Sequence, residues 1–270
     1  MKNRTQETSP AGGDDPRLEA FSNLRDRDLR SQGMMIAEGR WLAHRLIAAE
    51  YPNTQVLTTP RFADEFAEFA DRGGDLFVAD DDTLSAIAGF DFHRGVIASA
   101  DRPELPTLEQ ALSQATPGST IVILPDTGNA ENLGAIFRTA AALGIEIILL
   151  GERCCDEFSR RVLRVSMGAA FQLKLTRSTH LADDLTVLTD RGYQLAAMVL
   201  DQTAINLADF RPTAPTALMF GSEATGLEEP LIARAKIQLT IPMAPGADSL
   251  NLATAAAITL WHVQTSQPPT

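Results

Sequence analysis

Three short blocks in the C-terminal half combine glycines with polar side chains. Each block stands at the end of an apolar run. The blocks read Asn129-Ala-Glu-Asn-Leu-Gly-Ala-Ile-Phe-Arg138, Phe220-Gly-Ser-Glu-Ala-Thr-Gly-Leu227 and Ile241-Pro-Met-Ala-Pro-Gly-Ala-Asp-Ser-Leu-Asn251. This placement is typical of functional loops that follow strands. The side chains that can hold or orient a substrate are Asn132, Arg138, Glu223, Ser249 and Asn251.

The first block offers a guanidinium and an amide. The guanidinium of Arg138 can bind a phosphate bidentately, but a guanidinium stays protonated in proteins and is therefore a poor proton acceptor near neutral pH. The alternative is a surface arginine on an amphipathic helix. Asn132 either caps that helix or stands in the loop before it with an orienting role. The two residues are six positions apart, so they do not share one helical face.

The second and third blocks offer a flexible backbone and short polar groups. Gly221 and Gly226 allow close backbone approach and unusual φ angles. Glu223 is expected to accept hydrogen bonds from the asparagine or arginine of the first block, or else to be a solvated loop carboxylate. Ser249 and Asn251 begin the last helix, where Ser249 is a candidate N-cap.

Several other chemistries lack their motifs. The chain has no Gly-x-Gly-x-x-Gly dinucleotide fingerprint, no Walker A sequence and no Gly-x-Ser-x-Gly elbow, which argues against a generic α/β nucleotide-binding hydrolase. The four histidines are scattered without the spacing of metal ligands, so no metal site is expected.

Composition places the chain among ordinary globular proteins. It has 270 residues, of which 44% are hydrophobic and 21% charged, and no apolar run reaches the roughly 18 residues of a membrane span. The polar N-terminus predicts a disordered tail over residues 1–18 and no secretory signal. The two cysteines, Cys154 and Cys155, are adjacent, which fits a reducing cytoplasm better than a disulfide framework.

The net charge of −12 argues against general nucleic-acid binding, but positive charge is concentrated locally. Between Arg153 and Arg177 there are six basic and two acidic residues, and between Arg17 and Arg45 six basic and four acidic residues. Such clusters are either solvated surface or local contacts for phosphates.

Two α/β regions are expected to carry these residues. The first, over residues 33–100, alternates strands expected at 55–59, 76–79 and 95–99 with helices expected at 40–49, 60–70 and 82–88. The aromatic residues Phe62, Phe66 and Phe69 form a stripe that predicts core packing. A proline-rich segment from Asp101 to Thr107 predicts a linker.

The second region contains the three blocks. Its predicted strands are 120–124, 145–150, 172–175, 194–200, 216–220 and 237–241, and its predicted helices are 108–114, 133–143 and 252–264. Apolar, β-branched strands that alternate with helices predict a mostly parallel sheet.

Together the blocks resemble the SpoU (TrmH-type) RNA 2′-O-ribose methyltransferases of the SPOUT superfamily. They match Asn-x-Gly-x-x-x-Arg, Gly-Ser-Glu-x-x-Gly-Leu and Ile-Pro-Met…Ser-Leu-Asn. The N-terminal region is similar to the L30e-like substrate-binding domain of such enzymes at Met34–Gly39 and at His93-Arg-Gly-Val-Ile-Ala98, where Arg94 replaces the usual Gln.

The resemblance implies roles for individual residues. Asn132, Arg138, Glu223, Ser249 and Asn251 correspond to catalytic positions. Gly221, Ile241, Met243 and Leu250 correspond to positions that hold S-adenosyl-L-methionine, with the apolar side chains flanking adenine. Arg161 and Arg164, in a segment similar to Arg-x-Ser-x-Gly-Ala, would contact the RNA backbone together with Arg138, and Arg160 belongs to the same group.

The resemblance also implies an architecture and a partner. A tail at 1–18, an L30e-like RNA-substrate-binding domain at 19–101, a linker at 102–108 and a SPOUT domain at 109–266 are expected. The SPOUT domain would contain a mostly parallel sheet and a deep trefoil knot, which topology rules alone do not predict. Homodimers form through that domain in the family, and the last helix is a candidate surface.

The function implied by the resemblance is S-adenosylmethionine-dependent methylation of a ribose 2′-OH, with rRNA favoured and tRNA as the alternative. A non-catalytic RNA-binding or ribosome-assembly factor that kept the fold is a second hypothesis. The intact set of five polar residues counts against it.

Overall fold

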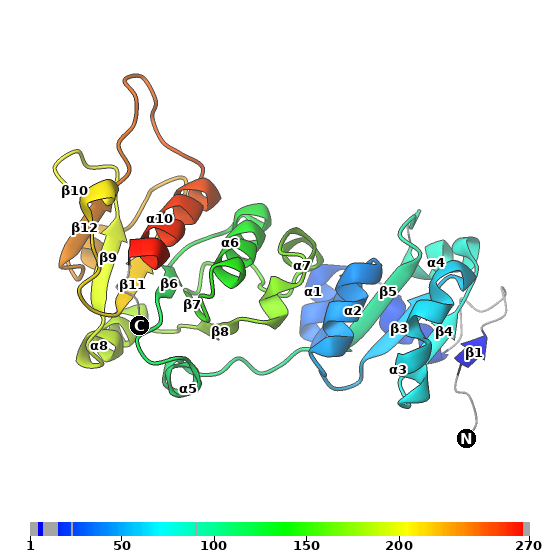
Figure 1. Cartoon of the computed structure of the whole chain (residues 1–270). Coiled ribbons are helices and arrows are strands. Elements are labelled where there is room, and N and C mark those ends of the chain that lie inside the picture. The colour runs from blue at the N-terminus through cyan, green and yellow to red at the C-terminus, as the bar shows by residue number, and fades with distance from the viewer. Residues whose placement is uncertain (1–4, 8–15, 23, 90, 267–270) are drawn as a thin grey trace. The chain divides into compact units, whose positions relative to one another are not determined.

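The computed structural model describes residues 5–7, 16–22, 24–89 and 91–266 (Figure 1). The chain forms two compact units, one of Met1–Glu104 with Phe158–Phe171 and one of Leu105–Glu157 with Gln172–Thr270. The junction between Glu104 and Leu105 falls inside the predicted linker. The prediction placed Phe158–Phe171 in the second domain, but this segment packs with the first unit.

The first unit contains a mixed five-stranded sheet. Its strands, in spatial order, are β1 (Thr5–Glu7), β4 (Asp75–Val78), β3 (Gln55–Thr58), β5 (Val96–Asp101) and β2 (Met34–Glu38). Strand β5 runs antiparallel to both β3 and β2, whereas β4 pairs in parallel with β1 and β3. Its α-helices are α1 (Asp26–Ser31), α2 (Arg40–Ala48), α3 (Ala67–Asp71), α4 (Asp81–Ala88) and α7 (Arg160–Val165).

Three short 3-10 helices complete this unit, namely η1 (Pro16–Phe21), η2 (Pro60–Phe66) and η3 (Ala169–Phe171). The predicted helix 60–70 is therefore split into η2 and α3. Phe66 is buried as the predicted aromatic stripe requires, while Phe62 and Phe69 are half-buried.

The prediction of a disordered tail over residues 1–18 is wrong in its described parts. Residues Thr5–Glu7 form β1 in register with β4, and η1 begins at Pro16. Leu18 and Phe21 are buried in the core of this unit because they pack on the sheet with Phe77 and Leu84. The rest of that predicted tail lies outside the described residues.

A buried carboxylate explains why α7 joins the first unit. Glu38, at the end of β2, is 6% exposed and forms an ion pair with Arg160, whose guanidinium also donates to the carbonyl of Leu24 at 2.6 Å. Arg164 lies 3.5 Å from the same carboxylate. A buried charge needs such partners, so Arg160 has a structural role here as the partner of Glu38, and its predicted RNA contact stays a prediction.

The second unit is built on a parallel seven-stranded sheet. Its strands, in spatial order, are β10 (Ile205–Asn206), β12 (Ile237–Thr240), β9 (Gln194–Met198), β11 (Thr216–Met219), β6 (Ile121–Leu124), β7 (Ile147–Leu150) and β8 (Lys174–Arg177). All six neighbouring pairs are parallel. The prediction of an α/β fold with a mostly parallel sheet is thus confirmed, with the ends of the six predicted strands shifted by at most two residues, while the short edge strand β10 was not predicted.

Helices cover both faces of this sheet. They are α5 (Leu108–Gln114), α6 (Ala130–Ala142), α8 (Leu181–Asp190), α9 (Glu229–Ile232) and α10 (Leu252–Ser266), with a 3-10 turn η4 (Leu207–Asp209). Leu108 of α5 and Leu185 of α8 belong to the core on one face. Helices α6 and α10 pack against each other and lie on the other side of the sheet in Figure 1. The sequence patterns missed α8, which is short and rich in threonine and aspartate.

One ion pair in this sheet makes stability depend on pH. The Glu146 carboxylate accepts a hydrogen bond from Lys174 Nζ at 2.6 Å and one from the Thr116 amide at 3.0 Å. The Lys174 contact is the main cause that lowers the pKa of Glu146 from 4.5 to about 2.

We expect Glu146→Gln to lower the free energy of unfolding by about 1 kcal/mol near neutral pH, since the pair is partly exposed. Because the folded-state pKa is the lower one, this stabilisation is present above the unfolded-state value of 4.5 and is lost as the pH falls towards about 2. Urea unfolding of both proteins across this range measures the difference. A difference that stayed constant with pH would contradict the assignment.

No helix in the described part of the chain is long and apolar enough to cross a membrane.

Candidate functional site

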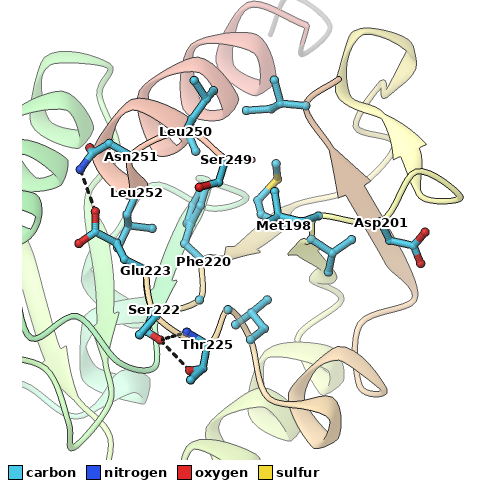
Figure 2. Close-up of a pocket in the computed structure, with 18 of the residues that line it drawn as sticks. Met198, Asp201, Phe220, Ser222, Glu223, Thr225, Ser249, Leu250, Asn251 and Leu252 are labelled. Carbon is cyan, nitrogen blue, oxygen red and sulfur yellow. Dashed lines mark hydrogen bonds between the residues drawn. The ribbon is translucent and has the colours of Figure 1, made fainter. Parts of the chain in front are cut away.

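A cavity of about 570 Å³ lies at the carboxyl ends of β9, β11 and β12, which are neighbours in the sheet (Figure 2). Its lining comes from the chain that follows each of these strands and from the first turn of α10. Parallel strands bring their carboxyl ends to one edge, where open α/β sheets bind ligands. The second and third sequence blocks therefore meet here.

The loop after β11 is closed on itself. The Ser222 amide donates to the Gly226 carbonyl at 3.1 Å, and the Gly226 amide donates back to the Ser222 carbonyl at 2.9 Å. The Ser222 and Thr225 hydroxyls lie 2.8 Å apart, and Gly226 has a left-handed φ of 68°. The backbone of this loop is thus preformed against the cavity.

Gly221 is required by this loop for steric reasons. A Cβ atom at this position would lie 2.1 Å from the carbonyl carbon of Gly226 and 2.2 Å from the amide nitrogen of Leu227. Both are backbone atoms, so no rotamer change could relieve the clash. Gly221 lines the cavity, as do the other predicted cofactor residues Ile241, Met243 and Leu250.

A single asparagine connects the three blocks. Asn251 Nδ2 donates to Asn132 Oδ1 and to Glu223 Oε1, each at 2.9 Å. Asn251 Oδ1 accepts from the amides of Ala253 and Thr254 at 3.0 and 3.3 Å. Because the oxygen faces two amides, the nitrogen must face Asn132 and Glu223. Figure 2 shows the bond from Asn251 to Glu223.

This connection corrects two predictions. Asn251 caps α10 through its side chain, so the N-cap is not Ser249. The carboxylate of Glu223 accepts from the third block, not from the asparagine or arginine of the first block. Ser249 is exposed at the cavity and makes no hydrogen bond within the described part of the chain.

Asn132 is neither an N-cap nor a loop residue, so that prediction was also wrong. It is the third residue of α6, which Asn129 caps by accepting from the amides of Glu131 and Asn132. The Asn132 side chain is 5% exposed, and its Nδ2 has no partner among the described residues. Its Oδ1 is held by Asn251, which lines the cavity, so a buried amide donor without a partner lies next to Asn251.

Within one chain, Arg138 does not contact the hydrogen-bonded cluster of Asn132, Glu223 and Asn251. It lies on the exposed side of α6 and makes no hydrogen bond or ion pair within the residues the structure describes. It does not line the cavity. This agrees with the spacing argument, since Asn132 on the same helix is buried and faces Asn251.

The sequence analysis missed the segment after β9. Met198, Val199, Leu200 and Asp201 line the cavity beside the third block. Asp201 Oδ1 accepts from the amide of Thr203 at 2.7 Å and from its hydroxyl at 2.8 Å, and these bonds lower the pKa of Asp201. A carboxylate directly after a strand predicted to be parallel was the signal that could have identified it.

The remaining predicted RNA contacts, Arg161 and Arg164, both lie on α7 and therefore belong to the first unit. Arg161 is exposed, whereas Arg164 is half-buried next to Glu38.

The cavity suits a ligand with an apolar ring and polar ends. Its volume lies within the usual range of small-molecule sites. Apolar side chains such as Met198, Ile241 and Leu250 form part of the wall, while the 221–227 backbone, Asp201 and Ser249 supply polar groups.

Comparisons with known proteins agree with this geometry. A model of the SpoU rRNA Methylase family matches residues 119–261. An uncharacterized tRNA/rRNA methyltransferase of Mycobacterium tuberculosis is 33% identical over 258 residues, covering 92% of this chain and 88% of its own length. The 23S rRNA (guanosine-2′-O-)-methyltransferase of Acinetobacter baylyi is 28% identical over 185 residues, covering 67% of this chain and 74% of its own.

Among solved structures, the AdoMet-bound rRNA methyltransferase from Sinorhizobium meliloti superposes with a TM-score of 0.80 at 25% identity, covering 96% of this chain and 97% of that one. The family model matches more than half of the residues. This match and the relatives together identify the family of the chain. The chain belongs to the SpoU rRNA methylase family, a family of RNA methyltransferases.

Proposed function

We propose that this RNA methyltransferase transfers a methyl group from S-adenosyl-L-methionine to a ribose 2′-hydroxyl, with rRNA as the favoured substrate and tRNA as the alternative. The observation that carries the proposal is the hydrogen-bonded cluster in which Asn251, in the cavity wall, holds both Glu223 and the buried amide of Asn132. Support for the reaction type comes from the A. baylyi relative, whose name specifies guanosine 2′-O-methylation.

The cavity residues fit the cofactor. The place that a Cβ of Gly221 would fill is taken by the backbone at 226–227, so this loop presents main-chain groups to a ligand. Ile241, Met243 and Leu250 offer apolar contact for an adenine ring, and Asp201 offers a carboxylate for polar donors. When bound, the cofactor supplies an electrophilic methyl group on a sulfonium.

The acceptor side is proposed to be the polar cluster. Asn132 Nδ2 would donate to an oxygen of the target ribose, which gives this buried donor the partner it lacks. Asn251 and Glu223 fix the orientation of that amide, and Ser249 adds a hydroxyl at the cavity wall. Alignment of this kind lowers a displacement barrier by several kcal/mol without a metal ion.

Arg138 is proposed to bind a phosphate of the RNA. An exposed guanidinium with no partner among the described residues is suited to bidentate phosphate contacts, and because a guanidinium stays protonated in proteins it is disfavoured as a base.

A homodimer through the second unit is also proposed. Trp261 and Ile258 are exposed on α10 although both are large and apolar, with Trp261 59% exposed. Sedimentation velocity should give twice the mass of the 29.1 kDa chain; a monomeric protein would remove this part of the proposal. The trefoil knot and the L30e-like identity of the first unit stay predictions from the family resemblance, and cytoplasmic localisation stays a prediction from the adjacent cysteines.

The function is tested by transfer of tritiated methyl from S-adenosylmethionine into separate rRNA and tRNA pools, followed by nuclease mapping. Label in a 2′-O-methylated nucleoside is the expected result, and the labelled pool identifies the RNA class. Absence of label in both pools, from protein that binds the cofactor, would favour the non-catalytic assembly factor.

A further inference from the structure

The first unit carries an exposed tryptophan beside a second, smaller cavity. Trp41, in the first turn of α2, is 63% exposed. The cavity measures about 240 Å³ and is lined by residues of β2, α2, the turn before β5 and the Phe158–Phe171 segment: Glu38, Gly39, Arg40, Trp41, Leu42, Arg94, Arg164 and Met167. All of these residues belong to the first unit.

Arginines surround this tryptophan. The Arg40 guanidinium carbon lies 4.8 Å from the centroid of the Trp41 ring, within cation–π distance. Arg94 is exposed, and its side chain passes over Gly39, whose Cβ position would lie 3.8 Å from Arg94 Cδ. Arg94 has no hydrogen-bond or ion-pair partner in the part of the chain that is described. It is also the residue that replaces glutamine in the family pattern.

The charge at this cavity is opposite to that of the whole chain. Its lining contains three arginines, Arg40, Arg94 and Arg164, and a single carboxylate, Glu38. The charge of Glu38 is paired with Arg160 and, at 3.5 Å, with Arg164, which leaves Arg94 as the arginine of this lining with no ion-pair partner among the described residues. Arg40 has a weak pair with Glu65, at 3.5 Å. On a chain of net charge −12, this local excess of positive charge favours an anionic partner at this cavity.

Met167 completes the rim. It has a left-handed φ of 53°, unusual for a methionine, and its carbonyl accepts a hydrogen bond from Arg45. This backbone conformation holds an exposed, polarisable side chain next to the tryptophan.

We infer that this cavity holds one unpaired nucleotide of the RNA substrate, with its base on Trp41 and its phosphate on Arg94. The inference rests on the proposed function for the nature of the substrate and adds a recognition site to it. Aromatic rings next to arginines bind bases that are free to leave a helix, since a base in A-form duplex is not accessible to them. The site would therefore select RNA with a loop or bulge at a set position.

The test uses tryptophan fluorescence, because the chain has only two tryptophans. The variant Trp261→Phe leaves Trp41 as the sole reporter. Unstructured oligouridylate and oligoadenylate, a perfect RNA hairpin and an acidic peptide are the probes. Both single strands should quench Trp41, the hairpin stem should quench it weakly, and the peptide should not.

Substitutions then separate stacking from charge. We expect Trp41→Ala to weaken single-strand binding about tenfold and Trp41→Phe to retain most of it. Arg94→Gln should weaken binding and lower the salt slope by about 1. The control is Arg72→Gln, which removes an exposed positive charge, paired with Glu68, from the residue that follows α3 elsewhere in this unit and should change neither quantity. Wild-type affinity of Trp41→Ala, or equal quenching by the hairpin or the peptide, would overturn the inference.

Methyl transfer distinguishes this inference from the proposed function. If the function holds and the site is real, Trp41→Ala should raise the KM for RNA about tenfold while kcat and cofactor affinity stay near the wild-type values. An unchanged KM in an active enzyme would overturn only the inference. Absence of all methyl transfer, with Trp41 still quenched by single strands, would overturn only the proposed function.

Discussion

Replacement of Gly221 by alanine is expected to abolish measurable binding of S-adenosylmethionine and, with it, methyl transfer. The added Cβ would lie 2.1 Å from the carbonyl carbon of Gly226, so the 221–227 loop must shift as a whole. That loop is closed by two backbone hydrogen bonds between Ser222 and Gly226, which the shift would strain or break. A displacement of about 1 Å at a positioned site costs on the order of 100-fold in rate.

Isothermal titration with S-adenosylmethionine and circular dichroism measure binding and folding separately. The matched control is Gly128→Ala, because Gly128 has open space at its Cβ position and no left-handed φ. Wild-type affinity is expected for that control. Normal cofactor affinity in Gly221→Ala would show that the cavity after β11 is not the cofactor site.

The periodicity of the sequence was sufficient to predict the sheet of the second unit. Its central strands, such as Ile121–Leu124 and Ile147–Leu150, are apolar throughout because helices cover both faces, and such runs are easily recognised. Helix α8 was not predicted, although Leu181, Leu185 and Leu188 have the helical spacing i, i+4 and i+7.

The domain boundary could not be predicted from local pattern. Segment Phe158–Phe171 joins the first unit through the ion pairs of Arg160 and Arg164 with Glu38, which are more than a hundred residues away in sequence. A run of basic residues has the same sequence pattern whether its charges face solvent, a phosphate or a buried carboxylate. This is why Arg160 was expected to contact RNA.

The sequence was sufficient to predict which residues of the second and third blocks form the site, but not which side chains are hydrogen-bonded to one another. All the predicted residues of the second and third blocks line one cavity, since parallel strands bring their carboxyl ends together. The hydrogen bonds of Asn251 to Asn132 and Glu223 depend on side-chain rotamers set by the cap of α10, which the sequence does not encode locally. Asp201 was missed because it lies outside the three blocks.

Replacement of Arg138 is expected to impair a different step from replacement of Gly221. Its side chain is exposed on α6 and lines no part of the cofactor cavity, so its removal should leave cofactor affinity unchanged. In the proposed role, Arg138 binds the phosphate of the target nucleotide. Without this contact the ribose loses its alignment with the methyl donor, and turnover depends steeply on that alignment.

We therefore expect Arg138→Ala to lower kcat/KM for RNA at least about 1000-fold while the Kd for S-adenosylmethionine changes less than about twofold. Arg138→Lys should recover only part of the loss, because an ammonium cannot bind a phosphate through two parallel hydrogen bonds. Single-turnover methyl transfer and calorimetric titration of the same preparations give both quantities. Arg211→Ala, which removes another arginine of this unit that lines no part of the cavity, serves as the charge control. Loss of cofactor affinity in Arg138→Ala would place its role at the cofactor, and full activity would leave Arg138 as an ordinary surface residue of α6.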